Sequence, residues 1–232
     1  MKLNFLFIQR DLFILPTKEG NMMSKNAPRD YSLIAPLYDQ IFQRFLAQGH
    51  VEIGQLLKKV KNKRGIKVLE IGVGSGLSLS HLPSAIDYKG IDINEKMLIR
   101  ARKKAEGLNR RKIALELMDA ENLTMRDNSY DLVMAASVIT AVDSPIRTMK
   151  EMIRVTKKGG HIAVIANLRE TSSIKSDFVK FFDPITRKYL GFRTDLDLES
   201  IKKLRNVKLV EHKKVNNVFG FPLSSFLLFQ KT

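Results

Sequence analysis

Residues 68–76 read VLEIGVGSG, in which an apolar run passes into three glycines at alternate positions, Gly72, Gly74 and Gly76. The run IKVLEIG (66–72) predicts a short buried strand that ends at the first glycine. Glycine is required where the backbone takes positive φ or where a ligand must approach the main chain closely. In open α/β sheets, ligands bind beyond the carboxyl end of such a strand. The segment therefore predicts a ligand-binding turn.

The spacing of the glycines separates this turn from two phosphate-binding loops. A dinucleotide-binding GxGxxG pattern would place glycine at position 77, where this chain has Leu77, and no GK[ST] follows as a P-loop requires. The GxGxG pattern alone is a weak signal, and a plain glycine-rich turn without a ligand is the alternative.

Acidic residues after the next two predicted strands favour a ligand. Asp92 ends the second strand, 20 residues after Gly72, where a carboxylate can accept hydrogen bonds from both hydroxyls of a ribose. The alternative for Asp92 is an acid that caps the following helix. The group Asp119-Ala120-Glu121 follows the third strand, where an adenine amino group can be recognised.

Strand-like runs alternate with helical patterns along the chain. The predicted strands lie at residues 66–72, 86–93, 112–118, 130–137 and 161–168, with two more strand-like stretches at 207–215 and 222–230. Apolar residues at helical spacing predict helices within 31–60 and roughly 171–204. This alternation indicates an α/β fold whose parallel sheet is covered by helices on both faces.

Two of the helices between strands carry signals at their ends. Asn94 is expected to cap the helix after the second strand. Asp143 or Ser144 is expected to cap the helix after the fourth strand, with Pro145 in its first turn and Gly159-Gly160 as its stop.

The composition restricts the partners and the chemistry. Forty Lys and Arg residues against 24 Asp and Glu give a net charge of +16, which favours a polyanionic partner, either an anionic membrane surface or nucleic acid. The alternative is that the basic runs at 58–64, 100–104 and 110–112 are solvated faces. The chain has no cysteine, which excludes disulfides and cysteine nucleophiles, and its four histidines lack metal-ligand spacing, so we expect no metal.

The N-terminal segment is apolar and basic. Its first 16 residues contain an apolar run interrupted by polar residues at 9–11, and the remaining pieces are too short to span a bilayer. No small-residue cleavage site follows, which disfavours a signal peptide. We expect residues 1–30 to be an extension that lies on a membrane surface or packs on the domain. The alternative is that translation begins at Met22 or Met23.

Five motifs carry a family resemblance. In order and spacing, VLEIGVGSG (68–76), GIDIN (90–94), MDAENL (118–123), DNSYDLV (127–133) and MIRVTKKGG (152–160) resemble those of class I S-adenosylmethionine-dependent methyltransferases. The resemblance implies a Rossmann-like, seven-stranded, mostly parallel sheet with an antiparallel last strand. It also implies S-adenosyl-L-methionine as the cofactor and S-adenosyl-L-homocysteine as its product.

The resemblance assigns roles to individual residues. It implies that Glu70 and the turn Gly72–Gly76 lie near the methionine part of the cofactor, Asp92 at the ribose, and Asp119 with Ala120 beside the adenine. The full set of residues expected at the cofactor is Tyr38, Glu70, Gly72, Val73, Gly74, Gly76, Asp92, Ile93, Met97, Asp119, Ala120, Glu121 and Ser137.

Further segments resemble bacterial phosphatidylethanolamine N-methyltransferases, namely IAPLYDQIF (34–42), GVGSGLSL (72–79), LGFRTDLDL (190–198) and FPLSSFLLF (221–229). One departure is that Leu168 and Arg169 follow Asn167, where that family has an Asn-His-Phe type sequence. The closer resemblance implies a methyltransferase domain at 31–232, with a core at 66–168, a helical lid at 31–60, and substrate-side helices and a hairpin at 169–232.

This resemblance implies methylation of the phosphatidylethanolamine amine towards phosphatidylcholine. We expect a monomer in the cytoplasm, peripheral on the inner face of the membrane and held there by anionic phospholipid. Transfer to nitrogen requires a neutral amine, whose conjugate acid has a pKa of roughly 10. Tyr38, in the predicted lid, is the candidate to position that amine, and a buried aromatic residue is the alternative.

Three other functions remain open. A small-molecule or quinone C-methyltransferase would share the DAENL and KKGG features. An RNA methyltransferase would use the positive charge, but no appended RNA-binding module or NPPY-type motif is present, so we expect no nucleic-acid partner. A catalytically inactive nucleoside- or membrane-binding module is the alternative outside the enzymes.

Overall fold

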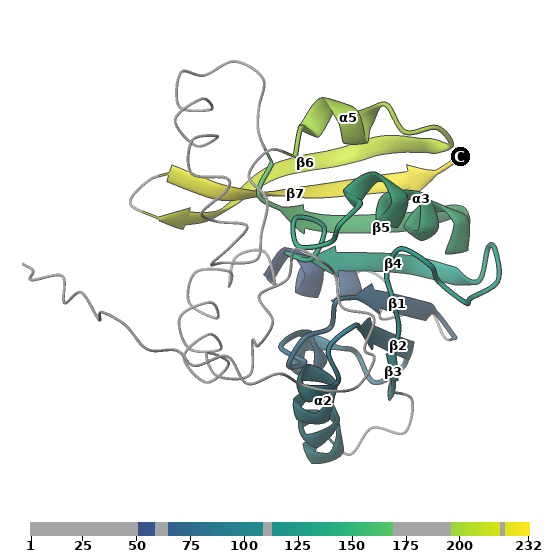
Figure 1. Cartoon of the computed structure of the whole chain (residues 1–232), viewed down its shortest axis with the longest axis vertical. Coiled ribbons are helices and arrows are strands. Elements are labelled where there is room, and N and C mark those ends of the chain that lie inside the picture. Colours follow the sequence, from purple (N-terminus) through teal and green to yellow (C-terminus); the bar gives the residue numbers. More distant parts are fainter. Residues whose placement is uncertain (1–50, 59–64, 109–112, 169–195, 219–220) are drawn as a thin grey trace, which may run out of the picture.

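The computed structural model describes residues 51–58, 65–108, 113–168, 196–218 and 221–232. Within these ranges the chain forms a seven-stranded sheet in the order β3-β2-β1-β4-β5-β7-β6 (Figure 1). The strands are β1 (Lys67–Ile71), β2 (Asp87–Asp92), β3 (Ile113–Leu117), β4 (Tyr130–Ala136), β5 (Thr156–Ala166), β6 (Val207–Val218) and β7 (Phe221–Lys231).

Strand directions confirm the predicted topology. The strands β1 to β5 pair in parallel, whereas β7 is antiparallel to both β5 and β6. Because the first five strands are parallel, they all end on one side of the sheet. We call this side the carboxyl end, formed by the residues at and after Ile71, Asp92, Leu117, Ala136 and Ala166. The opposite side, the amino end, is formed by the residues at and before Lys67, Asp87, Ile113, Tyr130 and Thr156.

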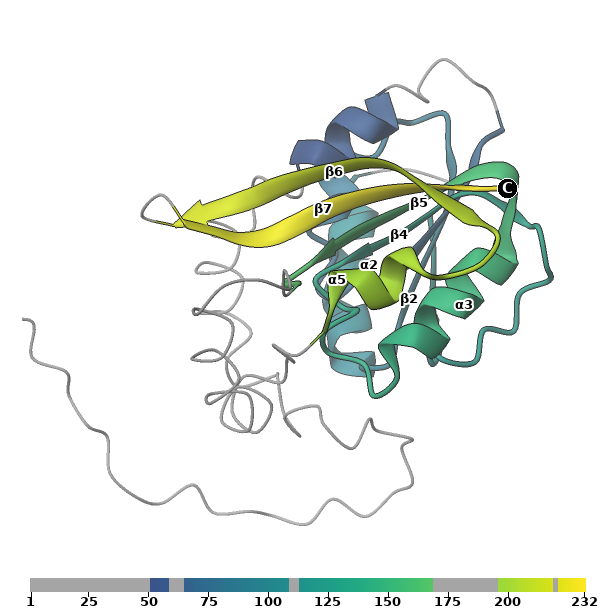
Figure 2. The ribbon, with the colours of Figure 1, turned by 90° about the horizontal axis from the view of Figure 1, so that it is seen from above.

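Two apolar cores, one on each face of the sheet, hold the layers together. Successive strand residues point to opposite faces, so that Leu69 belongs to one core and Val68 to the other. The first core packs against α3 (Pro145–Val155) and α5 (Leu198–Lys202). The second packs against the helical residues 51–58, η1 (Ser78–His81) and α2 (Glu95–Gly107). Figure 2 shows α3 and α5 on one side of the sheet and residues 51–58 on the other, as predicted.

The predicted start of α2 is confirmed, but the predicted end of α3 is wrong. The Asn94 side chain accepts hydrogen bonds from the backbone N–H groups of Lys96 and Met97 and so caps α2. The helix α3 begins at Pro145 after Ser144, but it ends at Val155 rather than at Gly159-Gly160.

The glycine pair serves β5 instead of stopping α3. The strand begins at Thr156, which pairs with Tyr130 before the register of the β4–β5 pair shifts. A Cβ added to Gly160 would lie 2.9 Å from the carbonyl oxygen of Lys157 and 3.0 Å from that of Asp131. Glycine is therefore required where the irregular start of β5 passes close to the backbone of β4.

Several predicted segments lie outside the described residues. The N-terminal extension at 1–30, most of the lid at 31–60, and residues 169–195 belong to this group. The division of the chain into these domains therefore stays a prediction, although the hairpin of β6 and β7 is present. In the described part of the chain, no helix combines the length and the apolar composition needed to cross a bilayer.

Candidate cofactor site

The glycine turn follows β1 at the carboxyl end of the sheet. Gly72 has a φ of 68°, and a Cβ added there would lie 2.5 Å from Cγ2 of Val138. Gly74 has a φ of 54°, but an added Cβ would meet no atom within 4 Å. Gly72 therefore allows tight packing against the chain after β4, whereas the α-carbon of Gly74 faces open space that a ligand can approach.

Backbone hydrogen bonds fix the turn to the end of β2. The N–H of Val73 donates to the carbonyl oxygen of Ile91 at 3.0 Å, and the N–H of Gly76 donates to that of Val73 at 3.0 Å. The N–H of Gly74 donates to Oδ2 of Asp92 at 2.8 Å. The structure thus brings together the two strongest signals of the sequence, the glycines and the acid at the tip of the second strand.

Asp92 receives backbone donors but is not the cap of the helix after it. Its Oδ1 accepts from the N–H of Asn94 at 2.9 Å, while Asn94 itself caps α2. Burial raises the pKa of the Asp92 carboxyl, and the hydrogen bonds from Asn94 and Gly74 oppose that rise. Since a carboxylate offers about four acceptor positions, Asp92 keeps the capacity to accept hydroxyl donors from a ribose.

Glu70 is buried beneath the turn, and sequence reasoning missed its two partners. Its Oε2 accepts hydrogen bonds from Oγ of Ser78 and from the hydroxyl of Tyr88, each at 2.5 Å. Burial raises the pKa of Glu70 to about 7, against the opposing effect of these two donors. The carboxyl group therefore connects β1, η1 and β2 directly below the glycine turn.

A glycine in β2 is the sequence signal that could have revealed Tyr88. Gly90 is opposite Glu70 in the β1–β2 register, and a Cβ added to Gly90 would lie 3.0 Å from the Tyr88 hydroxyl. An isolated glycine inside a strand often marks the close approach of another group. Here it leaves room for the hydroxyl that reaches the buried acid.

The two acids after β3 accept hydrogen bonds from different segments, Asp119 from its own loop and Glu121 from the residue before α3. Oδ1 of Asp119 accepts from the N–H of Glu121 at 2.8 Å, and Oε1 of Glu121 accepts from the N–H of Ser144 at 2.6 Å. Glu121 thus holds the start of α3. The N–H of Met118 donates to the carbonyl oxygen of Asp92 at 3.0 Å, which places the start of this loop beside the tip of β2.

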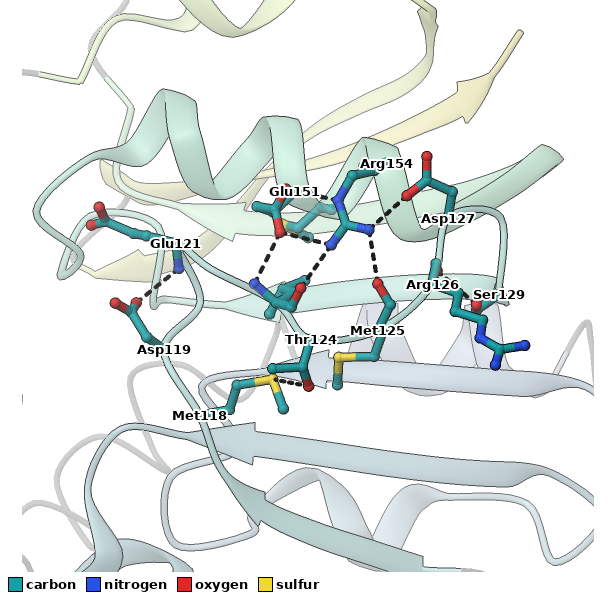
Figure 3. A network of polar contacts seen from close by, with 12 residues as sticks. Met118, Asp119, Glu121, Thr124, Met125, Arg126, Asp127, Ser129, Glu151 and Arg154 are labelled. Atoms are coloured by element: carbon teal, nitrogen blue, oxygen red, sulfur yellow. Dashed lines mark hydrogen bonds and ion pairs between the residues drawn. The ribbon is translucent and has the colours of Figure 1, made fainter.

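Arg154 fastens the rest of that loop to α3, a role that sequence reasoning did not predict (Figure 3). Its Nη1 donates to the carbonyl oxygen of Met125 at 2.8 Å and to Oδ1 of Asp127 at 2.7 Å. Its Nη2 donates to the carbonyl oxygen of Leu123 at 2.9 Å, and Nε and Nη2 both reach Glu151 at 2.8 Å. Glu151 in turn accepts from the N–H of Leu123 at 2.9 Å, and the hydrogen bond from Arg154 lowers the pKa of Glu151.

The remaining predicted residues occupy the same end of the sheet, except for Tyr38, which lies outside the described residues. Ile93 is 39% exposed, a high value for a large apolar side chain, whereas Met97 is buried. Ser137 has a φ of 61°, and its N–H donates to the carbonyl oxygen of Ile165 at 2.7 Å. An exposed apolar side chain next to Asp92 gives an adenine ring a surface to pack against.

These features fit an adenosyl ligand. The open side of Gly74 lets a ligand contact the main chain. Asp92 can accept hydrogen bonds from a ribose, and the apolar side chain of Ile93 can pack against a base. In the described residues, no group of three or more His, Cys, Asp or Glu side chains is arranged to hold a metal ion.

Comparison with known proteins supports the same ligand. Residues 69–164 match the family model described as a methyltransferase domain. The chain is 31% identical to a phosphatidylethanolamine N-methyltransferase of Cereibacter sphaeroides over 73% of this chain and 82% of that protein. It is also 31% identical to a demethylmenaquinone methyltransferase of Lactobacillus johnsonii, over 71% of each chain.

Solved structures share the fold. A putative methyltransferase from Bacillus halodurans matches with a TM-score of 0.62 and 18% identity, over 78% of this chain and 98% of that one. An S-adenosylmethionine-dependent methyltransferase from Methanosarcina mazei matches with a TM-score of 0.60 and 22% identity, over 75% and 96%. Together with the glycine turn, the acid beside it and the sheet order, these similarities place the chain in the family of S-adenosylmethionine-dependent methyltransferases.

Proposed function

We propose that this protein transfers methyl groups from S-adenosylmethionine to the amine of phosphatidylethanolamine at an anionic membrane surface on the cytoplasmic side. The observation that carries the proposal is the similarity to the phosphatidylethanolamine N-methyltransferase, which extends over 82% of that protein and therefore well beyond the cofactor motifs. The net charge of +16 supports it, because basic residues near an anionic leaflet contribute about 1 kcal/mol each to binding.

The residues of the chain supply binding and alignment rather than covalent chemistry. When bound, the cofactor supplies an electrophilic methyl group. Asp92 would accept hydrogen bonds from its ribose, Asp119 and Ala120 would lie beside its adenine, and the turn at Gly74 would face its methionine part. Transfer then depends on holding a neutral amine in line with the methyl group and on excluding water. We assign the positioning of the amine to Tyr38.

A second candidate function has its own supporting observation. The demethylmenaquinone methyltransferase has the same 31% identity over nearly the same share of this chain. Methyl transfer to a quinone ring carbon would use the same cofactor site with a different acceptor. The test of the proposed function must therefore offer both acceptors at once.

The decisive experiment incubates the purified chain with S-adenosylmethionine labelled in its methyl group. Liposomes of phosphatidylethanolamine and phosphatidylglycerol, with demethylmenaquinone added, provide both acceptors, and the lipids are separated by chromatography. We expect label in mono-, di- or trimethylated ethanolamine lipid, and much less label with the Asp92→Ala variant when the cofactor concentration is below saturation. Label only in the quinone would contradict the proposal and establish the second candidate.

Membrane association has a separate test. Raising the ionic strength from about 0.1 M to about 1 M shortens the electrostatic screening length from about 10 Å to about 3 Å. We expect co-sedimentation with phosphatidylglycerol liposomes to fall steeply over this range, and to be weak with phosphatidylcholine liposomes at any salt concentration. Binding that changes neither with the salt concentration nor with the anionic lipid content of the liposomes would contradict electrostatic attachment.

A further inference from the structure

A cavity of about 520 Å³ opens at the amino end of the sheet. It lies between the last turns of α3, the turn that follows α5, and the final residues of β7. In Figure 1 the last turn of α3 and the end of β7 lie near the C-terminus, on the side opposite to the arrowheads of β4 and β5. We call this cavity the basic cavity because of the charged residues that line it, namely Lys150, Arg154, Lys203, Arg205, Lys231 and Asp127.

The charges of the basic cavity are strongly unbalanced. Five cationic side chains and one carboxylate line it, so this concave surface carries a net charge of +4 out of the +16 of the whole chain. A concave site of this sign concentrates anions, because its low-dielectric walls focus the field. The volume falls within the range of about 300 to 1,000 Å³ that is usual for sites of small molecules.

Three of the five cations are available to a ligand. Arg154 is committed to Asp127, Glu151 and the loop carbonyls. In contrast, the side chains of Lys150, Lys203 and Arg205 are exposed and make no hydrogen bond or ion pair with any described residue. An arginine fork beside two lysines is the set of donors that phosphate groups favour.

The fifth cation is held in place at the inner wall. Nζ of Lys231 donates to Oδ1 of Asn128 at 2.9 Å and to the carbonyl oxygens of Arg154 and Thr156. Burial lowers the pKa of Lys231, and the positive charges of Lys158 and Arg154 lower it further, while Asp127 opposes the effect. An anion in the cavity would offset this repulsion between like charges.

The basic cavity is separate from the methyl-transfer site. Asp127 precedes β4, whereas Ser137 follows it, and the seven residues of β4 span about 20 Å at roughly 3.3 Å per residue. A ligand in the basic cavity therefore cannot share the cofactor or its methyl acceptor. Its charge also differs from that of the cofactor site, where the charged side chains are acids.

We propose that the basic cavity binds a phosphate group, carried either by a small water-soluble molecule or by a lipid headgroup. Lys150, Lys203 and Arg205 contact the phosphate oxygens, while Lys231 and Arg154 supply fixed positive charge behind them. This inference does not depend on the identity of the methyl acceptor, so its test is independent of the test of the proposed function.

The test uses inorganic pyrophosphate as the soluble probe and the full chain as the protein. Calorimetric titration at constant ionic strength should show saturable binding that is about tenfold weaker or more in the double variant Lys203→Gln/Arg205→Gln, which loses two charge-assisted contacts. The matched control is Arg100→Gln/Lys103→Gln on α2, which removes the same charge elsewhere and should leave the affinity unchanged.

A second titration distinguishes the source of the phosphate. Phosphatidylglycerol vesicles replace pyrophosphate with the same three proteins. If the cavity variant, but not the α2 control, loses binding of pyrophosphate while its vesicle binding is retained, the site is assigned to a soluble phosphate. If the cavity variant, but not the α2 control, loses binding of vesicles while its pyrophosphate binding is retained, the site is assigned to a lipid headgroup. The proposal is overturned if neither probe binds, or if the cavity variant and the α2 control weaken binding equally.

Discussion

The two ends of the sheet use their charged residues in different ways. At the carboxyl end, Asp92 accepts two backbone N–H groups and keeps acceptor positions for a ligand. At the amino end, Arg154 binds Glu151 and Asp127, and Lys157 binds Asp131 at 2.8 Å. Arg154 and Lys157 at the amino end are thus paired with acids, whereas Asp92 at the carboxyl end has no cationic partner among the described residues. Stabilisation and cofactor binding are thereby assigned to opposite ends of the same strands.

If this division holds, a variant of the amino end should lose stability. Replacing Arg154 with Leu removes the guanidinium hydrogen bonds to the carbonyl oxygens of the loop, to Glu151 and to Asp127. Because hydrogen bonds to charged groups contribute more than neutral ones, losing this partly buried set should lower the free energy of unfolding by about 3 kcal/mol. Urea denaturation followed by circular dichroism measures the change.

The matched control is Arg102→Leu, because Arg102 pairs with Glu95 on the exposed surface of α2. Exposed pairs contribute about 0 to 1 kcal/mol. A loss for Arg154→Leu no larger than that for Arg102→Leu would show that the network in Figure 3 does not stabilise the loop.

At the carboxyl end, the corresponding variant should lose binding. We expect Asp92→Ala to weaken the affinity for S-adenosylhomocysteine about 100-fold, or about 2.7 kcal/mol, because hydrogen bonds to a charged acceptor contribute strongly to binding. Asp92→Asn retains one acceptor oxygen, so its affinity should lie between those of the unchanged chain and of Asp92→Ala. Calorimetric titration provides the affinities, and equal values for all three proteins would contradict the assignment of Asp92 to the ribose.

Glu70 is the exception to the division, since it lies next to the carboxyl end yet is buried, with the hydroxyls of Ser78 and Tyr88 as its side-chain donors in the described part of the chain. Its pKa rises from an ordinary 4.5 to about 7 on folding. Between these values the folded chain keeps a proton that the unfolded chain releases, so stability must fall as the pH rises. From about pH 5 to about pH 8 we expect Glu70 to account for a loss of about 2 kcal/mol.

Two variants test this pH dependence. For each, the urea concentration at the midpoint of unfolding is measured from about pH 5 to about pH 8. Glu70→Gln cannot titrate and should abolish the part of the slope that Glu70 causes. Tyr88→Phe removes a hydrogen bond that lowers the pKa of Glu70, so the transition should move to higher pH. An unchanged slope in Glu70→Gln would show that the buried acid does not titrate in this range.

The sequence predicted the elements with a periodic signal or a glycine signature. The parallel strands covered by helices follow from the alternation of strand and helix patterns, and the position of Gly74 and Asp92 at one end of the sheet follows from the crevice at the carboxyl ends of parallel strands. Asn94 was predicted as a cap because its side chain needs only local backbone partners.

Long-range polar contacts could not be predicted in this way. Arg154 reaches Leu123 from 31 residues away, and Tyr88 reaches Glu70 from 18 residues away. Such partners depend on strand register and on the path of a loop, which no local pattern specifies. The Gly159-Gly160 pair was misassigned for a related reason, since a stop of α3 and a bulge in β5 call for the same residue type.

The smallest expected effect on stability concerns the open side of the glycine turn. Gly74→Ala places a Cβ in the left-handed region, which should lower the free energy of unfolding by about 1 kcal/mol. Because that Cβ enters the space assigned to the cofactor, affinity for S-adenosylhomocysteine should fall as well. Gly72→Ala should destabilise the fold more, since its Cβ meets Val138. Gly107→Ala on α2 should leave the affinity unchanged and should not lower stability, because its Cβ meets no atom and alanine favours the helix. Unchanged affinity in Gly74→Ala would mean that the ligand approaches the turn from another side.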